Sequence, residues 1–482
     1  MFSLRDLKRY RKCPRLFYKY YTHQVEEVDF IKVDENITNL LIKKFNIKKN
    51  YIASQIVNVN KLNEKHIFEA KFEYVGLDVE IPYMVKKKDC FDIYFVDLSV
   101  EPKISKIKDY AITYWVLKKN DVKVDKIKII YLNKNFVKSE NSNDSALFKV
   151  SSSIHSHGHY IGNVTKLVKK KKIHYTDDLI AMKKVVELDK LPEMVSNCNI
   201  KVKCELKAEC YNYDNLPNDS VLYLYSSKSK FEMYKNGIVH MKDSDLDLIE
   251  GNKIQYQQIK ASQNGGLSFD KLALKMWLKQ LENTVITFID FEWETYAIPK
   301  YNGLKPYDVV CFQYSMDILY KDNTKEHHEY IGQGDTRLQF VKRLIHDTPK
   351  NSVIVAYNAT GAEKIRLKEL TEQLPEYKDE LLDINSRMID ISVPFVNGMV
   401  YELNMRGSYT LKAVYNAISK HGTYNKLNIS TAMDAVSNWR SIDDINNDSN
   451  KKVKEDLLRY CGLDTKSMVV IYKWLLKIAN NQ

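Results

Sequence analysis

An apolar strand that ends in two carboxylates constrains the C-terminal half of this 482-residue chain most strongly. In VITFIDFEWE, the residues from Val285 to Ile289 predict a buried strand, and Asp290 and Glu292 follow two residues apart. Successive side chains of a strand point to opposite faces, so both acids lie on one face. Because burying an unpaired ion is costly, the strand end requires a positive partner, and a hard divalent cation is the simplest one.

A helix near the C-terminus offers further polar groups for the same pocket. The segment DLLRYCGLDTKSMVVIYKWLLKI has helical apolar spacing and carries Tyr460 and Asp464 four residues apart. Positions four apart share a helix face, so both side chains can point toward the strand end. The two segments together predict one site built from an Asp-x-Glu strand and a Tyr-x-x-x-Asp helix.

A further carboxylate is expected between these two segments. SVIVAYNATGAEKIRLKELTEQL predicts a strand, a turn and a helix, with Glu363 in the first helical turn. There the helix dipole favours an ionised acid, as a Mg²⁺ or Mn²⁺ site requires. The alternative is structural, because Thr360 and Glu363 have the spacing of a capping box.

These residues resemble the motifs of a nuclease family. Asp290-Phe291-Glu292, Asn358 followed by Glu363, and Tyr460-x-x-x-Asp464 are similar to the three motifs of DnaQ-like, DEDD-type 3′→5′ exonucleases of the tyrosine subtype, which have an RNase H-like fold. The resemblance implies two Mg²⁺ or Mn²⁺ ions held by the four acids, with Tyr460 orienting the attacking water. It also implies substrate contacts from Asn358, Arg387 and Lys412.

Two positions depart from this pattern or complicate it. The second motif usually supplies Asp after an aromatic residue, whereas Ala362 and Glu363 stand here. Glutamate keeps the charge but reaches one methylene further. Glu294 would share the face of Asp290 and Glu292 if the strand continues through Trp293.

The whole chain resembles a bacterial family that joins a RecB-type, PD-(D/E)XK-like domain to a DnaQ-like domain. Shared stretches include RKCPRLFYKY, KSKFEMYKNGI, RMIDISVPF and YCGLDT. We therefore expect an α+β protein with a PD-(D/E)XK-like domain at 1–215, a hairpin around Asn236-Gly237 and a connector at 216–280, and an RNase H-like mixed-sheet domain at 281–482.

The N-terminal domain is expected to lack nuclease activity. Active PD-(D/E)XK members need an Asp on one strand, a Glu-x-Lys on the next and often a helical Gln. These positions read here Pro82, Asp97-Leu98-Ser99 and, after Asp109, Thr113. Without the lysine no cation stabilises the transition state, so the expected role is nucleic-acid binding. If the strands are aligned differently, Asp78, Glu80 or Asp92 would serve instead.

Four of the seven cysteines show an organised pattern. Cys198, Cys204 and Cys210 repeat with five intervening residues, and Cys13 precedes a proline far upstream. Structural zinc sites usually use tighter pairs. The pattern is similar to the [4Fe–4S] staple of RecB-type domains, and the alternative is a set of thiols without a metal.

Composition agrees with a nucleic-acid partner. The formal net charge is +12 and the chain contains 33 tyrosines, so phosphates and bases both have complementary groups. An AT-rich coding sequence also produces abundant Lys, Asn, Ile and Tyr. The sequence contains no apolar run of membrane-spanning length and no signal-peptide core at its start, so we expect a cytoplasmic protein without membrane association.

Three functions therefore remain open. The first is a metal-dependent 3′→5′ exonuclease acting on single-stranded DNA or RNA ends. The second is a non-catalytic nucleic-acid-binding or adaptor protein on a retained nuclease scaffold. The third is an iron–sulfur redox sensor that controls either activity.

Overall fold

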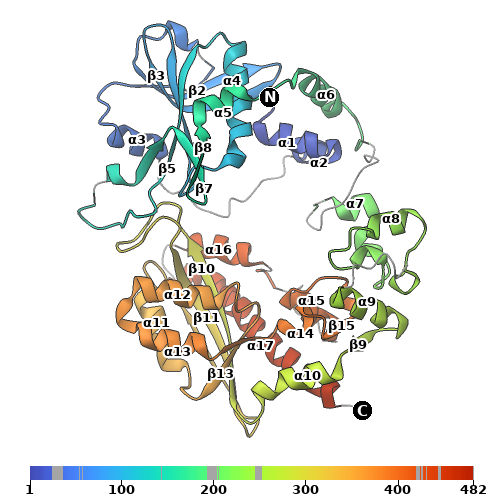
Figure 1. The fold of residues 1–482 in the computed structure, drawn as a ribbon. Helices are drawn as coiled ribbons and strands as arrows, with labels where there is room; N and C mark the ends of the chain where they lie inside the picture. Colours follow the sequence, from blue (N-terminus) through green and yellow to red (C-terminus); the bar gives the residue numbers. More distant parts are fainter. Residues whose placement is uncertain are drawn as a thin grey trace. The chain divides into compact units, whose positions relative to one another are not determined.

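The computed structural model describes residues 1–23, 36–53, 55–56, 58–142, 144–192, 204, 206–244, 252–419, 424, 427–429, 431–442 and 447–480. Contacts divide the chain into an N-terminal unit, Met1–Cys210 with Tyr296–Asp308, and a C-terminal unit, Tyr211–Thr295 with Val309–Gln482. Both units combine helices with β-sheets, which confirms the α+β class (Figure 1). Within the described ranges, none of the helices is both long and apolar enough to span a bilayer.

The N-terminal unit is built on a six-stranded sheet. Its strands lie in chain order: β1 (Tyr51–Ile52), β2 (His66–Tyr74), β3 (Leu77–Lys86), β4 (Phe91–Asp97), β5 (Val124–Leu132) and β6 (Phe148–Ser151). β2, β3 and β4 form an antiparallel meander, whereas β4 and β5 are parallel. Parallel neighbours need a crossover, which α4 (Ile107–Lys119) supplies. A small hairpin, β7 (Ser153–Ser156) with β8 (His159–Asn163), follows.

Helices at both ends of this unit pack together. Ser3 caps α1 (Leu4–Lys12) in a reciprocal capping box with Asp6, and Pro14 starts α2 (Pro14–Thr22), where its missing N–H costs nothing. The described ranges of the unit also contain α3 (Ile37–Lys44), α5 (Val164–Lys170), α6 (Thr176–Val186) and the start of α7 (Lys207–Tyr211). Phe17, Ile81 and Val116 are among its fully buried core residues.

A loop from the second half of the chain completes the N-terminal unit. Residues 296–308 connect two strands of the C-terminal unit but pack with the N-terminal one. Ala297 and Ile298 join an apolar cluster that contains Phe68 and Ile130. The Tyr307 hydroxyl donates a hydrogen bond to the Leu98 carbonyl. The N-terminal unit is therefore discontinuous in sequence.

The C-terminal unit contains a five-stranded mixed sheet. In spatial order the strands are β12 (Lys325–Ile331), β11 (Val309–Leu319), β10 (Val285–Thr295), β13 (Ser352–Ala356) and β14 (Met388–Asp390). β10, β11 and β12 are antiparallel, and β13 and β14 run parallel to β10. The sheet is therefore mixed, as the sequence predicted for this part of the chain.

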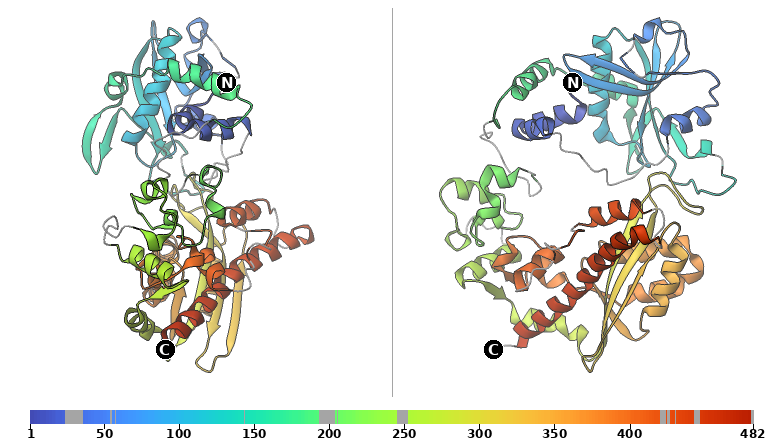
Figure 2. Two further views of the ribbon diagram at one scale, coloured as in Figure 1. Left: turned by 90° about the vertical axis from the view of Figure 1, so that its right-hand side faces the viewer. Right: turned by 180° about the vertical axis from the view of Figure 1, so that it is seen from behind.

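Helices cover both faces of this sheet (Figures 1 and 2). Ile289 and Phe291 of β10 pack on the side of α11 (Arg337–Asp347), α12 (Glu363–Gln373) and α13 (Lys378–Ser386). Ile286 and Phe288 face the opposite side, together with α17 (Lys451–Asn480) and α10 (Lys271–Leu278). Strand alternation thus presents Asp290 and Glu292 to α17. Shorter helices complete the unit: α14 (Val393–Val396), α15 (Leu411–Ile418) and α16 (Ala432–Arg440).

The hairpin predicted around Asn236-Gly237 is wrong. Residues Lys230–Lys235 form helix α8, Asn236 is its C-cap, and Gly237 follows with φ +87°. An Asn-Gly pair suits a hairpin turn, but a glycine with positive φ also ends helices, and the helical use prevails here. In the described range 206–244, strand pairing occurs as a single bridge between Ser220 and His240. After α9 (Lys253–Gln263), β9 (Leu267–Phe269) pairs with β15 (Val400–Glu402).

Candidate metal centre

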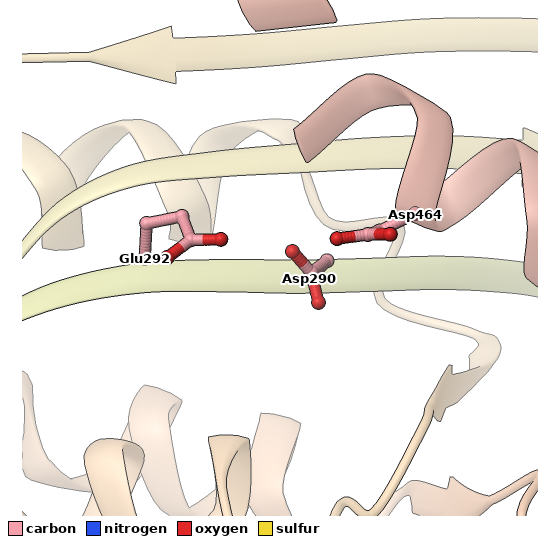
Figure 3. Close-up of side chains that lie close together, drawn as sticks. All are labelled: Asp290, Glu292 and Asp464. Atoms are coloured by element: carbon pink, nitrogen blue, oxygen red, sulfur yellow. The ribbon is translucent and has the colours of Figure 1, made fainter. Parts of the chain in front are cut away.

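Three carboxylates converge between β10 and α17. Among the residues that the structure describes, Asp290, Glu292 and Asp464 each place one oxygen within 4.8 Å of the others. The two strand acids come from the α17 side of β10, and Asp464 points at them from α17 (Figure 3). Glu292 and Asp464 are buried, and Asp290 is partly buried. The expected convergence of strand and helix is therefore present for these three residues.

This arrangement fits a hard divalent cation. Mg²⁺ holds oxygen ligands at about 2.1 Å, so two ligands of one ion lie at most about 4.2 Å apart. The observed limit of 4.8 Å needs only a small closing movement. All three donors are carboxylate oxygens, the ligand type that Mg²⁺ and Mn²⁺ prefer.

The electrostatics of the group also call for a cation. Burial raises the pKa of Asp290 well above its usual range, and the charges of Asp464, Glu292 and Glu363 raise it further. Burial likewise raises the pKa of Glu292, again with Asp464 acting in the same direction. The pKa of Asp464 rises to about 6, chiefly through burial. The ionised site is thus unfavourable without added positive charge.

Lys412 and Tyr460 lie beside the acids, as the sequence predicted for Tyr460. The Lys412 Nζ donates to the Tyr460 hydroxyl at 3.2 Å and lies 4.7 Å from the centre of its ring. Its charge lowers the pKa of Glu292 and Asp464 without offsetting burial. Burial and the neighbouring acids raise the pKa of Tyr460. Tyr460 is therefore a neutral hydroxyl next to the candidate ligands at physiological pH.

Glu363 lies near the three acids but outside their group. It is the first residue of α12, and its N-cap Ala362 makes no side-chain capping bond, so the capping-box alternative is wrong. The carboxylate accepts a hydrogen bond from the Phe291 backbone, while Oε2 is buried without a hydrogen-bond partner. Burial raises the pKa of Glu363 to about 8. Its charge acts on Asp290 and Glu292, which places it within electrostatic reach of the site.

Glu294 has a different role. β10 does continue through Trp293, but its pairing register with β11 shifts between Glu292 and Trp293. Glu294 is 1% exposed and forms a two-pronged ion pair with Arg440, with Nη2 to Oε1 at 2.8 Å. The carboxylate is thus compensated by an arginine, and it anchors α16 to β10.

Two residues at the site were not recognised from the sequence. The Tyr424 hydroxyl donates to Asp464 Oδ1 at 2.5 Å and lies 3.0 Å from Ser467 Oγ. The Cys461 thiol lies 3.4 Å from Asp290 Oδ2. Spacing of three residues from Asp464 could have placed Cys461 on the same helix face. Tyr424 is 40 residues from Asp464, and no periodic signal connects them.

Polar side chains of β11 and β12 extend the site across the sheet. Thr465, next to Asp464, donates to Asp317 Oδ2 at 2.7 Å and lies 3.0 Å from Ser315 Oγ. Asp317 also contacts His327 Nδ1 at 3.0 Å. Ser315 is the cross-strand partner of Asp290. These bonds fix α17 against the sheet at the level of the acids.

The three predicted substrate-contacting residues lie in different places. Lys412 is at the acids, whereas Asn358 follows β13 at the edge where β10 reaches Asp290. The Asn358 N–H donates to Asp390 Oδ1 at 2.9 Å. Arg387 donates to the Ser352 carbonyl at 2.7 Å, at the other end of β13. Ser352 pairs with Val285, five residues before Asp290, or about 16 Å along the strand. The structure thus gives Arg387 a structural role.

The predicted iron–sulfur ligands do not form a cluster in the described structure. Cys13, Cys204 and Cys210 are partly buried and do not converge at metal-ligand spacing. Cys198 lies outside the described residues. These cysteines do not fit a [4Fe–4S] cluster, which needs four thiolates around one centre.

In the N-terminal unit, residues at which the resemblance to PD-(D/E)XK nucleases predicted motif positions form local contacts. Asp109 forms an ion pair with Lys8 at 2.7 Å, and Thr113 donates to the Asp109 carbonyl. Asp92, one of the alternative acids, pairs with Lys87 at 2.8 Å. Asp78 and Glu80 line a cavity of about 600 Å³ that also contains Lys71. In the described part of this unit no three potential ligands converge as those of β10 and α17 do.

Comparisons with known proteins cover parts of the chain. A family model described as a domain of unknown function (DUF2779) matches residues 287–410, which include Asp290, Glu292 and Glu363. No curated protein matches the chain. A structure of the family B DNA polymerase from the hyperthermophilic archaeon Pyrobaculum calidifontis matches 40% of this chain and 24% of the polymerase chain, at 16% identity and a TM-score of 0.25. The matched region thus spans about a quarter of the polymerase chain.

Proposed function

We propose that the C-terminal unit is a metal-dependent 3′→5′ exonuclease that hydrolyses single-stranded DNA or RNA ends. The convergence of Asp290, Glu292 and Asp464 within 4.8 Å is the observation that carries this proposal. Bound between these carboxylates and Glu363, two Mg²⁺ or Mn²⁺ ions would stabilise the attacking and leaving oxygens of an in-line phosphodiester hydrolysis.

The surrounding side chains suit the same chemistry. Tyr460 remains protonated because burial raises its pKa, so its hydroxyl can hold and orient an attacking water. Lys412 donates to that hydroxyl and adds a positive charge where a phosphate would lie. Tyr424 holds Asp464 in position through its hydrogen bond.

Glu363 favours a second candidate function. Its carboxylate lies outside the group of three acids, and a pKa of about 8 keeps it protonated at neutral pH without a metal. A site that lacks its fourth ligand would leave a non-catalytic nucleic-acid-binding or adaptor protein. That protein would bind nucleic acid equally well with and without an intact acid group.

Labelled single strands distinguish the two functions. DNA and RNA oligonucleotides labelled at the 3′ or the 5′ end are incubated with Mn²⁺ and wild type, Asp290→Asn or the exposed control Asp379→Asn. The exonuclease predicts that wild type and the control release the 3′ label as mononucleotides and shorten the 5′-labelled strand stepwise. It also predicts that Asp290→Asn and a chelator abolish both. Binding without any shortening in wild type would support the adaptor.

A further inference from the structure

A basic pocket lies in the N-terminal unit between α1 and the start of α4. Its volume is about 620 Å³. Five cationic side chains and one acid are among the residues that line it: Lys8, Arg11, Lys12, Lys106, Lys108 and Asp109. Positions 8, 11 and 12 share one face of α1, so a single helix delivers three of the cations.

Only two of the five cationic side chains in the pocket form ion pairs with acids in the described residues. Lys8 pairs with Asp109 at 2.7 Å, and Arg11 pairs with Asp178 at 2.5 Å. Lys12, Lys106 and Lys108 are exposed and form no ion pair with any residue in the described ranges. The pocket therefore presents three lysines whose charges are not neutralised locally.

Helix stability does not explain the two lysines at the N-terminal end of α4, Lys106 as its N-cap and Lys108 in its first turn. Lys106 and Lys108 flank the first residue of a 13-residue helix, where the dipole disfavours cations. The N-terminal end of the helix and the lysines both attract a negatively charged ligand. An anion in this pocket would offset the mutual repulsion of the lysines and their unfavourable position on the dipole.

We propose that this pocket binds the phosphodiester backbone of a single nucleic-acid strand. A pocket of about 620 Å³ holds a ligand of one or two nucleotides, which is far less than a segment of duplex. Its recessed shape does not suit a flat lipid surface. Arg11 lies 4.5 Å from the Tyr175 ring centre and stays 43% exposed, so its guanidinium plane can stack on a base. This site is independent of the acid group and does not depend on the proposed exonuclease activity.

Binding by the full chain, measured in a chelator so that no strand is hydrolysed, tests the pocket. The triple variant Lys12→Gln, Lys106→Gln and Lys108→Gln is compared with Lys48→Gln, Lys49→Gln and Lys172→Gln, which removes three exposed lysines elsewhere in the same unit. Fluorescence anisotropy of a labelled 12-nucleotide strand is followed from low to high salt. The pocket triple should weaken binding at least about tenfold and reduce the salt slope by about two, because each single-strand phosphate contact contributes about 0.7. The control triple should change affinity less than about twofold.

Two further arms make the result decisive. Replacing the same three lysines by arginine keeps the charge and should retain wild-type binding, which separates charge from misfolding. Poly-glutamate and a nucleoside monophosphate should displace the strand only at far higher concentrations than an unlabelled strand. The proposal would be overturned if both glutamine triples lost affinity equally, or if the pocket triple bound the strand as wild type does. It would also be overturned if poly-glutamate or the mononucleotide displaced the strand as effectively as an unlabelled strand.

Discussion

Asp464 is the residue on which the candidate metal centre depends most. It connects α17 to the two strand acids and accepts a hydrogen bond from Tyr424. Its pKa of about 6 reflects burial, which the Tyr424 hydrogen bond and the Lys412 charge only partly offset. Changes at this residue and its partners therefore have measurable effects on both stability and pH dependence.

Tyr424→Phe should shift the pH dependence of hydrolysis. The lost hydrogen bond lowers the pKa of Asp464 in the wild type, so its removal raises that pKa. A hydrogen bond to a charged group contributes roughly 1.5–3 kcal/mol, which corresponds to about one to two pH units. The acid limb of the pH–rate profile should move upward by about one unit, with little change above pH 8. The control is Tyr415→Phe, which removes the hydroxyl of a buried tyrosine whose ring packs on Tyr424. Identical pH–rate profiles for wild type and Tyr424→Phe would show that the Tyr424 hydrogen bond does not set the pKa of Asp464.

Asp464→Asn should stabilise the chain when no metal is bound. The folded-state pKa of about 6 lies above the ordinary value of 3.8, so the folded state binds the extra proton. This group's contribution to stability is then fully present at low pH and is lost as pH rises from about 4 to 6. The asparagine removes that loss, which is on the order of 3 kcal/mol. The free energy of unfolding is measured with urea in a chelator at pH 5 and pH 7.5. Its decrease between these pH values should be smaller in the variant than in wild type. An equal decrease in both would disprove a raised pKa of Asp464.

At the scale of elements, the strand β10 and the helix α17 determine where the acids meet. Both could be predicted from the sequence because each has a long apolar pattern of one period, with the acids placed on a defined face. The segment around Gly237 could not, because its short apolar pattern fits a hairpin and a capped helix equally well. Tyr424 was likewise out of reach, since only the tertiary fold brings it to Asp464.

Arg440→Met should test how firmly α16 is held to β10. The Glu294 carboxylate is 1% exposed, and removing its arginine leaves a buried charge without compensation. Such losses destabilise proteins by about 3–5 kcal/mol. The same change at Lys253, whose pair with Asp270 is largely exposed, should cost less than about 1 kcal/mol. Chemical denaturation measures the free energy of unfolding of both variants. Adding Glu294→Gln to Arg440→Met should recover much of the lost stability, because the buried charge is then removed. Equally small losses of stability at Arg440 and Lys253 would show that Arg440 does not compensate the Glu294 charge.

At the scale of the whole molecule, the two units carry opposite charge chemistry. The C-terminal unit gathers carboxylates at one buried site, and the N-terminal unit gathers lysines around a pocket. The sequence predicted that Asp290, Glu292 and Asp464 would lie together, but it indicated the basic site only through the net charge of +12. The reason is that the pocket lysines come from α1 and from the N-terminal end of α4, about 95 residues apart, and their proximity depends on tertiary packing. The iron–sulfur prediction failed for the described cysteines for the same reason, since sequence spacing did not establish that they meet.

Direct titration of Mn²⁺ into the metal-free chain tests whether Asp290, Glu292 and Asp464 form a metal centre. Electron paramagnetic resonance reports free Mn²⁺ and hence the number of ions bound. Wild type and Asp379→Asn should bind one to two ions per chain, more tightly at pH 8 than at pH 5, because the ligands must lose their protons. Asp290→Asn combined with Asp464→Asn should abolish this binding. Equal Mn²⁺ binding by wild type and the double variant would show that these carboxylates do not form a metal centre.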